Sequence, residues 1–360
     1  MVKGYLIITM RMKRFLSLLF RNGISLHPRY LLCLMFLLQS SFWSSFMAFR
    51  EKLLYGRKIK NTPVPTNPIF IIGHWRSGST YLHQLFGCDP QFTVPDQLQC
   101  TYPESFISGR KFIEPIMGFM IPDKRPMDNV KAGLREPQED EYALFRLTGF
   151  SPVERLIFPH SADYFLAGDE TFLPPQSRLH QWESAVLHFA AKLYFHTGKR
   201  IVFKNPFHSM RIPILRKLFP DARFIHIYRN PLTVIPSTEH MWTVVGKENA
   251  LRKEWKPPKL EAIISCYNNV ISSINKDLSN LPKERYIEIR FEDLEKGPIA
   301  VIEQIYRHFS IDLTDVFEEK MKTFLKSVEG YKKNHYELSK EQEHTIRTQL
   351  NDHMKKYGYL

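Results

Sequence analysis

The chain has 360 residues, of which 43% are hydrophobic, and a formal net charge of +13. This length allows one large α/β domain or two small ones, each with a buried core. The positive charge suits an anionic membrane or a polyanionic ligand, and a basic surface in contact with solvent is the alternative. Nucleic acid is not expected as a partner, because the Lys and Arg residues are scattered without zinc-finger or basic-zipper spacing.

The four cysteines are too few and too widely spaced for a disulfide framework: Cys33, Cys88, Cys100 and Cys266. They contain no C-x-x-C pair, so no structural zinc site is expected. No Asn-x-Ser/Thr glycosylation acceptor with a permitted middle residue occurs in the chain. These features favour a cytoplasmic catalytic domain, at the inner face of a membrane if the N-terminal segment binds one.

Residues 1–64 are predicted to form a basic N-terminal extension that contains an apolar helix. From Tyr30 to Phe49 twenty residues pass without a charge, and this length can span a bilayer. Polar residues dilute the second half of this segment, and basic residues flank both of its ends, so no orientation is indicated. Three alternatives stay open: a helix in the membrane surface, a single span, or a helix packed on the catalytic domain.

The segment Pro68–His83 joins an apolar strand to a turn that is suited to phosphate. Gly73, four residues, Gly78 and two hydroxyl residues nearly match the phosphate-loop pattern G-x-x-x-x-G-K-[ST], but the lysine is missing. Its absence argues against ATP or GTP hydrolysis and leaves the backbone donors of a helix N-terminus available. The turn carries one arginine and three hydroxyls: Arg76, Ser77, Ser79 and Thr80. An ordinary Ser-capped turn is the alternative.

A second predicted strand, 222–228, is followed directly by Arg229, Asn230 and Pro231. Pro231 suits the first position of a helix, so Arg229 is expected at the carboxyl edge of the strand. Open α/β sheets bind ligands at this edge.

Together the two segments resemble those of the PAPS-dependent sulfotransferase family. Residues 70–80 are similar to its loop for the 5′-phosphosulfate of 3′-phosphoadenosine-5′-phosphosulfate (PAPS), where Lys or Arg precedes Ser-Gly-Thr-Thr. Residues 229–237 are similar to its 3′-phosphate segment, in which an Arg is followed eight residues later by a Ser, here Ser237. The sequence Gly-His-Trp-Arg-Ser-Gly resembles the branch that is common in bacteria. The resemblance extends from about residue 65 to the C-terminus.

The resemblance implies a catalytic domain at 65–360 with the sulfotransferase fold, a P-loop-like parallel sheet flanked by helices on both faces. The residues by themselves predict strands at 68–72, 200–204, 222–228 and 286–291. Helices are predicted at about 79–88, 138–148, 180–197, 209–219, 231–243, 260–279 and 297–310. This alternation is typical of an α/β fold. A last helix is expected after the capping box that begins at Ser339.

The long connection from 92 to 180 is rich in proline and aromatic residues, among them Pro103, Pro115, Phe106, Phe112, Phe119, Pro122 and Pro126. We expect it to build the acceptor pocket near the strand ends, and an irregular surface layer is the alternative.

The resemblance implies PAPS as co-substrate and no metal. The 5′ end would be bound by Arg76, Ser77, Gly78, Ser79 and Thr80, and the 3′ phosphate by Arg229 and Ser237. Arg76 and Lys204 would neutralise the charge that develops on the leaving group. A salt-bridge role in the core is the alternative for Lys204.

The general base stays open between Glu141, in the cluster Glu139-Asp140-Glu141, and His208, with His74 and His83 behind them. The carboxylates of the cluster could instead complement a helix dipole.

The resulting hypothesis is a sulfotransferase that acts on an acceptor hydroxyl, with a lipid or sterol alcohol suggested by the apolar N-terminus. Two alternatives are a nucleotide or nucleoside kinase with a degenerate phosphate loop, and a non-catalytic nucleotide-binding protein attached to a membrane. The sequence gives no indication of the oligomeric state.

Overall fold

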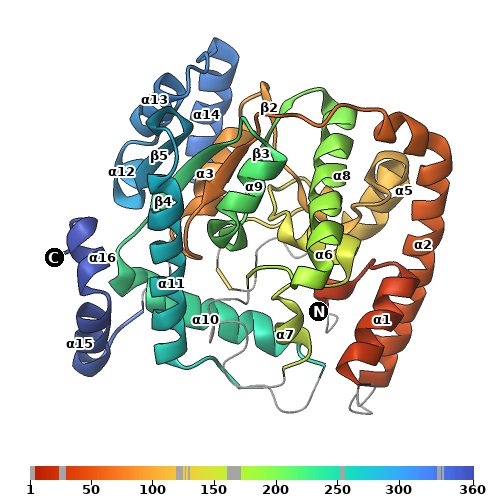
Figure 1. Cartoon of the computed structure of the whole chain (residues 1–360), viewed down its shortest axis with the longest axis horizontal. Coiled ribbons are helices and arrows are strands. Elements are labelled where there is room, and N and C mark those ends of the chain that lie inside the picture. Colours follow the sequence, from red (N-terminus) through yellow and green to blue (C-terminus); the bar gives the residue numbers. More distant parts are fainter. Residues whose placement is uncertain are drawn as a thin grey trace.

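A wholly parallel, five-stranded sheet forms the centre of the fold (Figure 1), with the strand order β2-β3-β1-β4-β5. The computed structural model describes residues 5–23, 30–118, 125, 127–128, 130–159, 172–251, 256–330, 334 and 336–360. The strands are β1 (Ile69–Ile72), β2 (Phe92–Thr93), β3 (Arg200–Lys204), β4 (Arg223–Tyr228) and β5 (Tyr286–Arg290). The four predicted strands are confirmed; β2 was missed because its two residues are too short to give a pattern.

The central strand β1 is buried along its whole length. Ile69 and Ile71 pack in the core on one face of the sheet, and Phe70 and Ile72 pack in the core on the other. Helices therefore cover both faces, which explains why this strand is an unbroken apolar run and not an alternating pattern.

Each of the strands β1, β3, β4 and β5 is followed by a helix. These helices are α3 (Ser79–Gly87), α9 (Ile212–Leu218), α10 (Pro231–Asn249) and α12 (Phe291–Lys296). At the start of α10 the side chain of Asn230 accepts a hydrogen bond from the Leu232 N–H, and Pro231 occupies the first turn. This confirms the helix start that Pro231 predicted. The helix predicted at 209–219 begins at Ile212, because the 3₁₀ helix η4 (Pro206–Met210) precedes it.

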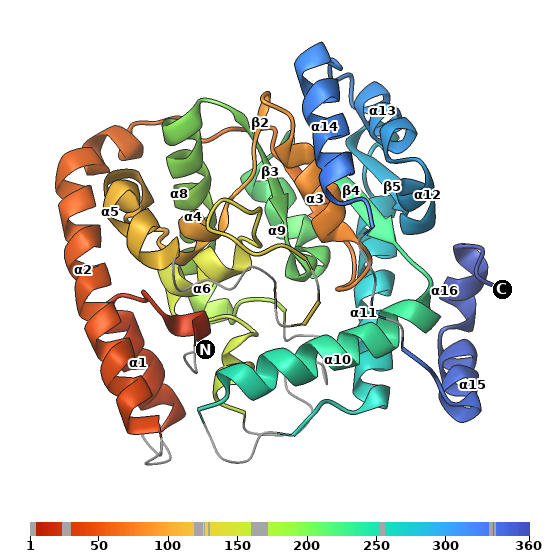
Figure 2. The same cartoon turned by 180° about the vertical axis from the view of Figure 1, so that it is seen from behind.

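The other helices complete the layers around the sheet (Figures 1 and 2). They are α4 (Gln97–Thr101), α5 (Phe106–Gly118), α6 (Glu141–Thr148), α7 (Glu154–Ile157), α8 (Leu179–Thr197), α11 (Leu260–Ser279), α13 (Pro298–His308), α14 (Asp315–Ser327), α15 (Lys340–Gln349) and α16 (Asn351–Lys356). Short 3₁₀ helices are η1 (Tyr5–Ile7), η3 (Gln176–Arg178) and η5 (Lys283–Arg285). The capping box at Ser339 is confirmed, although the last helix is divided at Leu350 into α15 and α16.

The N-terminal extension packs against the rest of the molecule through α1 (Met12–Asn22) and α2 (Leu31–Lys60). Figure 2 shows both helices along one side of the fold, next to α5 and α8. Phe15 of α1 and Leu37 of α2 belong to the same core cluster as Phe70 of the central strand. By length and composition alone α2 could cross a membrane.

Candidate active site

The carboxyl ends of three neighbouring strands bring the predicted site residues together. Strand β1 lies between β3 and β4, and Ile71 pairs with Lys204 on one side and with Ile225 on the other. The turn after β1, the Lys204 side chain and Arg229 after β4 therefore meet at one edge of the sheet, as expected for a parallel α/β fold.

The turn at 73–78 takes a path that only glycine permits at two positions. Gly73 has a φ of 144°, and a Cβ there would lie 2.4 Å from the Ile227 carbonyl oxygen. Gly78 has a φ of 94°, and a Cβ there would lie 2.0 Å from the Phe291 ring. Between them Arg76 adopts a φ of 66°, a left-handed conformation that is unfavourable for a residue with a side chain. Such strain is typical of ligand-binding turns.

Arg76 reaches across the site to two partners from distant parts of the chain. Its Nε donates to the Ser237 Oγ at 2.8 Å, and its Nη1 lies 2.7 Å from the Asp128 carboxylate. Asp128 also accepts hydrogen bonds from Arg125. Burial favours the neutral form of Asp128, but Arg125 and Arg76 outweigh burial and hold its pKa below the ordinary value. The carboxylate thus balances two guanidinium groups.

Arg229 lies beside Arg76 at the start of α10. Its Nη1 donates to the Arg76 carbonyl oxygen at 3.3 Å, and its guanidinium lies over the Phe291 ring, 4.4 Å from the ring centroid. Burial lowers the pKa of Arg229. The fold therefore brings together Arg76, Arg229 and Ser237, which the resemblance to sulfotransferases assigned to one ligand.

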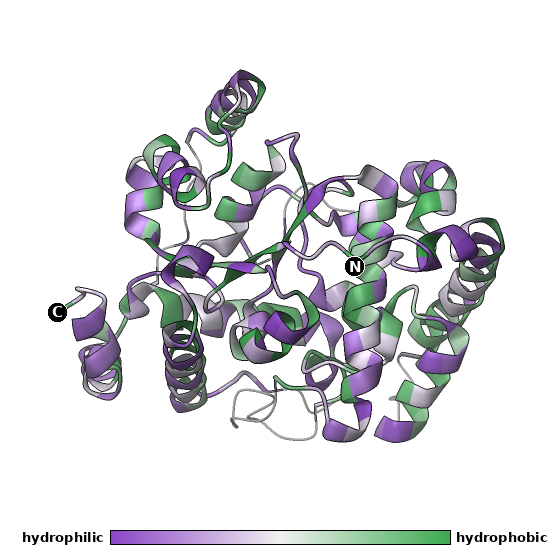
Figure 3. Ribbon diagram, turned by 45° about the horizontal axis from the view of Figure 1, so that its top comes forward, coloured by the Kyte–Doolittle hydropathy of each residue, from purple (hydrophilic) through white to green (hydrophobic). Residues whose placement is uncertain are grey.

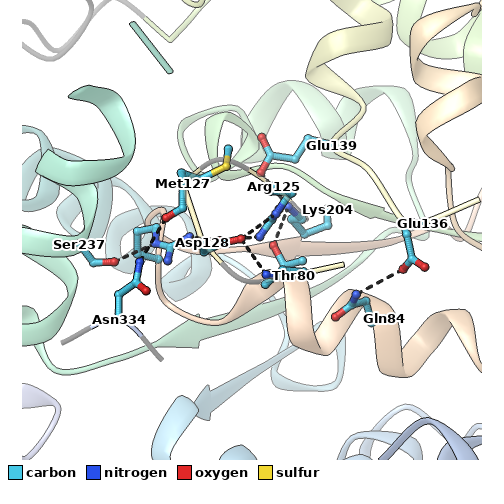
Figure 4. Close-up of polar contacts among 12 residues, drawn as sticks. Thr80, Gln84, Arg125, Met127, Asp128, Glu136, Glu139, Lys204, Ser237 and Asn334 are labelled. Atoms are coloured by element: carbon cyan, nitrogen blue, oxygen red, sulfur yellow. Dashed lines mark hydrogen bonds and ion pairs between the residues drawn. The ribbon is translucent and has the colours of Figure 1, made fainter. Parts of the chain in front are cut away.

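Lys204 is almost fully buried, with 2% of its side chain exposed. Its Nζ lies 2.7 Å from the Glu139 Oε1 and donates to the Thr80 Oγ1 at 3.3 Å (Figure 4). Burial lowers the pKa of Lys204, and the Glu139 carboxylate opposes this change. Lys204 thus forms the salt bridge that was the alternative to a catalytic role, and it also contacts Thr80 in the first turn of α3.

Three successive carboxylates each contact a different basic side chain from the segment 204–211. Glu139 pairs with Lys204, Asp140 lies 2.8 Å from the His208 Nε2, and Glu141 lies 2.6 Å from the Arg211 Nη1. The second and third pairs are buried, with no side chain more than 2% exposed, whereas 16% of the Glu139 side chain is exposed. The Glu139 carboxylate is therefore partly accessible to solvent, whereas those of Asp140 and Glu141 lie in the core.

The two residues that the sequence put forward as the base, Glu141 and His208, therefore lie in the core. Glu141 also accepts hydrogen bonds from Asn205 and Ser151. Burial favours its neutral form, but Arg211 outweighs burial and keeps the pKa of Glu141 below the ordinary value. These contacts hold the turn before α6 in place, and they leave the Glu141 carboxylate inaccessible to a substrate.

The other two candidate bases, His74 and His83, are buried, as is Ser77. Burial lowers the pKa of His74 to about 4 and that of His83 to about 3, so both rings are neutral at pH 7. The Ser77 hydroxyl is buried and donates to the His74 carbonyl oxygen at 2.7 Å. Within the described part of the chain, none of these three side chains lines the cavity next to the turn.

That cavity has a volume of about 1610 Å³ and opens beside the turn. Its polar wall consists of Arg76, Gly78, Ser79, Thr80, Arg125, Asp128, Glu139, Arg229 and Ser237, among others. Apolar side chains complete it, including Leu6, Ile8, Met117, Met127, Leu134, Trp242 and Val245. Met117, Met127 and Leu134 come from the connection 92–180, but the described proline and aromatic residues that the prediction named there, Pro103, Phe106, Phe112 and Pro115, do not line the cavity. The part formed by residues 5–8 was not expected. Phe119, Pro122 and Pro126 of that connection lie outside the described residues.

The sequence profile of the sulfotransferase family matches residues 68–315. The chain belongs to the sulfotransferase family. It is therefore an enzyme, and the kinase and the inert binding protein considered from the sequence are set aside.

Two curated relatives of this sulfotransferase differ in the acceptors that their names give. Omega-hydroxy-beta-dihydromenaquinone-9 sulfotransferase Stf3 of Mycobacterium bovis and Mycobacterium tuberculosis is 29% identical over 345 residues, which cover 96% of this chain and 88% of the relative. Carbohydrate sulfotransferase 5 of Mus musculus is 22% identical over 286 residues, which cover 72% of this chain and 69% of the relative.

Solved structures agree with the fold of this sulfotransferase. Sulfotransferase STF9 from Mycobacterium avium superposes with a TM-score of 0.70 at 16% identity, and the match covers 97% of each chain. STF1 from Mycobacterium tuberculosis gives 0.60 at 17% identity and covers 94% of this chain and 91% of that one. These similarities confirm the predicted fold class.

The sequence missed three charged residues of this sulfotransferase site: Arg125, Asp128 and Glu139. Glu139 stands in the acidic cluster that was considered, but spacing alone could not tell which carboxylate faces the cavity. Arg125 and Asp128 lie in an irregular connection without periodicity, so no local pattern indicated them.

Proposed function

We propose that this enzyme transfers a sulfuryl group from PAPS to the hydroxyl of a lipid-like acceptor. The observation that carries the proposal is the cluster of Arg76, Arg229 and Lys204 at one sheet edge, next to a large cavity with many apolar side chains. A bisphosphorylated donor needs positive charge at both of its ends, and the acceptor needs apolar space beside one of them.

The glycine path of the turn supports donor binding at its 5′ end. A Cβ at Gly78 would clash with Phe291, so the backbone runs closer to its neighbours than any other residue permits. The first turn of α3, with Ser79 and Thr80, provides N–H and hydroxyl donors for the 5′ phosphosulfate. Arg229 and Ser237 would bind the 3′ phosphate. Ser77 would contribute through its backbone only, since its hydroxyl is used within the turn.

We assign the general base to Glu139. Its carboxylate lines the cavity, unlike those of Asp140 and Glu141, and a base must reach the acceptor hydroxyl. The acceptor oxygen would attack sulfur and lose its proton to Glu139, while the bond from sulfur to the 5′ phosphate breaks. Lys204 and Arg76 would stabilise the charge that develops on the leaving phosphate.

In the free protein Glu139 and Lys204 neutralise each other at 2.7 Å. Binding of the donor brings a competing negative charge to Lys204 and weakens its hold on Glu139. The pair would therefore link donor binding to release of the Glu139 carboxylate from its salt bridge.

The acceptor class follows from the cavity and from one relative. Leu6, Met117, Met127 and Trp242 suit an apolar chain better than a sugar. The name of Stf3 states a hydroxylated menaquinone as acceptor, and this relative spans nearly the whole chain. We extend this class, a terminal hydroxyl on an isoprenoid quinone or related lipid, to the present enzyme. We also propose that it works on the cytoplasmic side of a membrane.

The test is incubation of the full chain with radiolabelled PAPS and a panel of hydroxylated quinones, sterols, phenols and sugars. We expect label in the lipid products and binding of adenosine 3′,5′-bisphosphate in a calorimeter. Label only in sugars would overturn the acceptor class. No binding of the bisphosphate would overturn the donor assignment.

A further inference from the structure

One side of α2 presents large apolar residues to solvent. Met35, Phe42, Phe46, Phe49 and Leu53 are each more than half exposed. Their intervals of seven, four, three and four residues keep them on one side of an α-helix. We call these five residues the outer face of α2. Figure 3 shows the hydrophobic bands on the helices at this side of the molecule.

Aromatic residues extend the outer face sideways onto α5. The Trp43 ring contacts Phe42 and Phe46 with centroid distances of 6.3 and 6.1 Å. The Arg50 guanidinium lies 5.8 Å from the Phe112 ring centroid on α5. Phe112 is itself 62% exposed. Contiguous exposed apolar surface of this kind marks an interaction site, and Trp with Arg is typical of the membrane interface.

The opposite side of α2 is held in the protein by polar contacts. Glu51 and Lys192 of α8 form an ion pair in which each side chain is 2% exposed, and Lys192 also donates to the Pro103 carbonyl oxygen at 2.6 Å. The Ser45 hydroxyl accepts a hydrogen bond from the Met12 N–H at 2.9 Å. Moving α2 into the bilayer would break these contacts and leave Lys192 buried without its counter-ion. This argues against a transmembrane span.

The charge of α2 favours an anionic partner. Glu51 is the one acidic residue between Leu31 and Lys60, and it is buried. The exposed charges on the helix are all positive: Lys52, Arg57, Lys58 and Lys60. An apolar stripe with a basic end matches a bilayer that contains anionic lipids.

We propose that the outer face of α2 docks on the surface of an anionic bilayer, with the helix parallel to the membrane plane. The apolar side chains enter the headgroup boundary while Arg57 and Lys60 contact lipid phosphates. The inner side of the helix stays packed on α1, α5 and α8.

Docking in this orientation places the cavity wall next to the lipid. Met117 lines the cavity and directly follows Ile116 of α5, which is 67% exposed. Tyr5 and Leu6 line the same cavity and precede α1, which packs on α2. A lipid acceptor thus reaches the cavity along α5 without crossing water; this consequence, unlike the docking itself, rests on the proposed function.

The experiment measures partition of the full chain onto vesicles of phosphatidylcholine, with and without phosphatidylglycerol. We expect binding to the mixed vesicles that weakens as salt rises. The triple variant F42S/F46S/F49S should bind about 100-fold more weakly, from the loss of buried apolar area. Arg57→Gln and Lys60→Gln should each weaken binding about fivefold. The matched control is Val316→Ser, which removes an exposed apolar residue on α14 and should bind as the wild type does.

Several outcomes would overturn docking. Equal binding of wild type and triple variant, when circular dichroism shows both folded, places the contact elsewhere. A wild-type dimer that the triple variant abolishes, without vesicle binding, identifies a second copy as the occupant. Membranes that keep the protein after alkaline carbonate extraction would indicate a span. Binding of adenosine 3′,5′-bisphosphate, measured on the same variants, separates these results from a failure of the proposed function.

Discussion

The ion pairs at the two ends of Glu139-Asp140-Glu141 have the same chemistry and opposite surroundings. Glu139 lines a large cavity and pairs with Lys204, which is itself buried, whereas Glu141 and Arg211 both lie in the core with almost no exposure. Glu139 and Glu141 are only two positions apart, yet the Glu139 carboxylate can contact a substrate and the Glu141 carboxylate can only stabilise the fold. The comparison shows that an acidic cluster has no single function, because each carboxylate follows the direction of its own side chain.

The largest effect is expected from Glu139→Gln. This change removes the proposed base and leaves the shape of the site intact, so kcat should fall about 10²–10⁴-fold. Initial rates at saturating donor measure the effect, and calorimetry should show that adenosine 3′,5′-bisphosphate still binds. Turnover close to that of the wild type would assign the base to another residue.

Glu141→Gln should act on stability instead. It leaves the Arg211 guanidinium buried without its carboxylate, which costs about 3–5 kcal/mol of unfolding free energy. Urea unfolding of this variant and of Glu139→Gln gives the direct comparison. If Glu139→Gln lowers the free energy of unfolding more than Glu141→Gln does, then the Glu141–Arg211 pair is not the one that stabilises the fold.

Lys204→Met tests the cation of the cavity-facing pair. We expect kcat to fall about 10²–10³-fold, because charge on the leaving phosphate loses a stabilising partner. Stability should change little, since methionine suits a buried position and Glu139 can be solvated from the cavity. Rates and urea midpoints measured on one preparation check both statements, and an unfolded variant with normal specific activity in its folded fraction would refute the catalytic role.

The buried residues His74 and His83 predict how the free energy of unfolding decreases at acidic pH. The ordinary histidine pKa is 6.5, while burial lowers that of His83 to about 3 and that of His74 to about 4. As the pH falls below 6.5, the unfolded chain binds protons that the folded chain does not. Stability should therefore fall by about 1.4 kcal/mol per pH unit for each ring. Denaturant unfolding between pH 6.5 and 4 should give a shallower slope for His83→Gln than for the wild type.

The smallest effect is expected at an exposed pair, which provides the baseline. Arg285 and Asp221 lie 2.9 Å apart with side chains 31% and 53% exposed. Arg285→Ala should cost less than about 1 kcal/mol, because water and salt screen the interaction. A loss as large as that of Glu141→Gln would mean that burial is not what separates these pairs.

The sequence by itself determined the strands that end at Lys204 and Tyr228 and the turn around Gly78. These features depend on local physical rules: apolar runs for buried strands, proline at a helix start, and glycine where no Cβ fits. The residues alone also placed Arg229 at the carboxyl edge of a strand, whereas the assignment of Arg76, Arg229 and Ser237 to one ligand came from the resemblance to the sulfotransferase family.

Only the tertiary structure decided which charges face the cavity. Glu139 and Glu141 are indistinguishable by spacing, and their directions depend on the partners that the segment 204–211 places around them. Arg125 and Asp128 follow no period, so their contact with Arg76 could not be foreseen.

The same limit applied to α2, where composition gave an apolar helix of sufficient length but left its environment open. The buried ion pair of Glu51 and Lys192 shows that the inner side of α2 packs on the protein, because a charge in the core needs its counter-ion. The sequence therefore could not predict which side chains pair across long separations. Hydrophobic periodicity describes a single helix or strand, whereas an ion pair joins residues of two different elements.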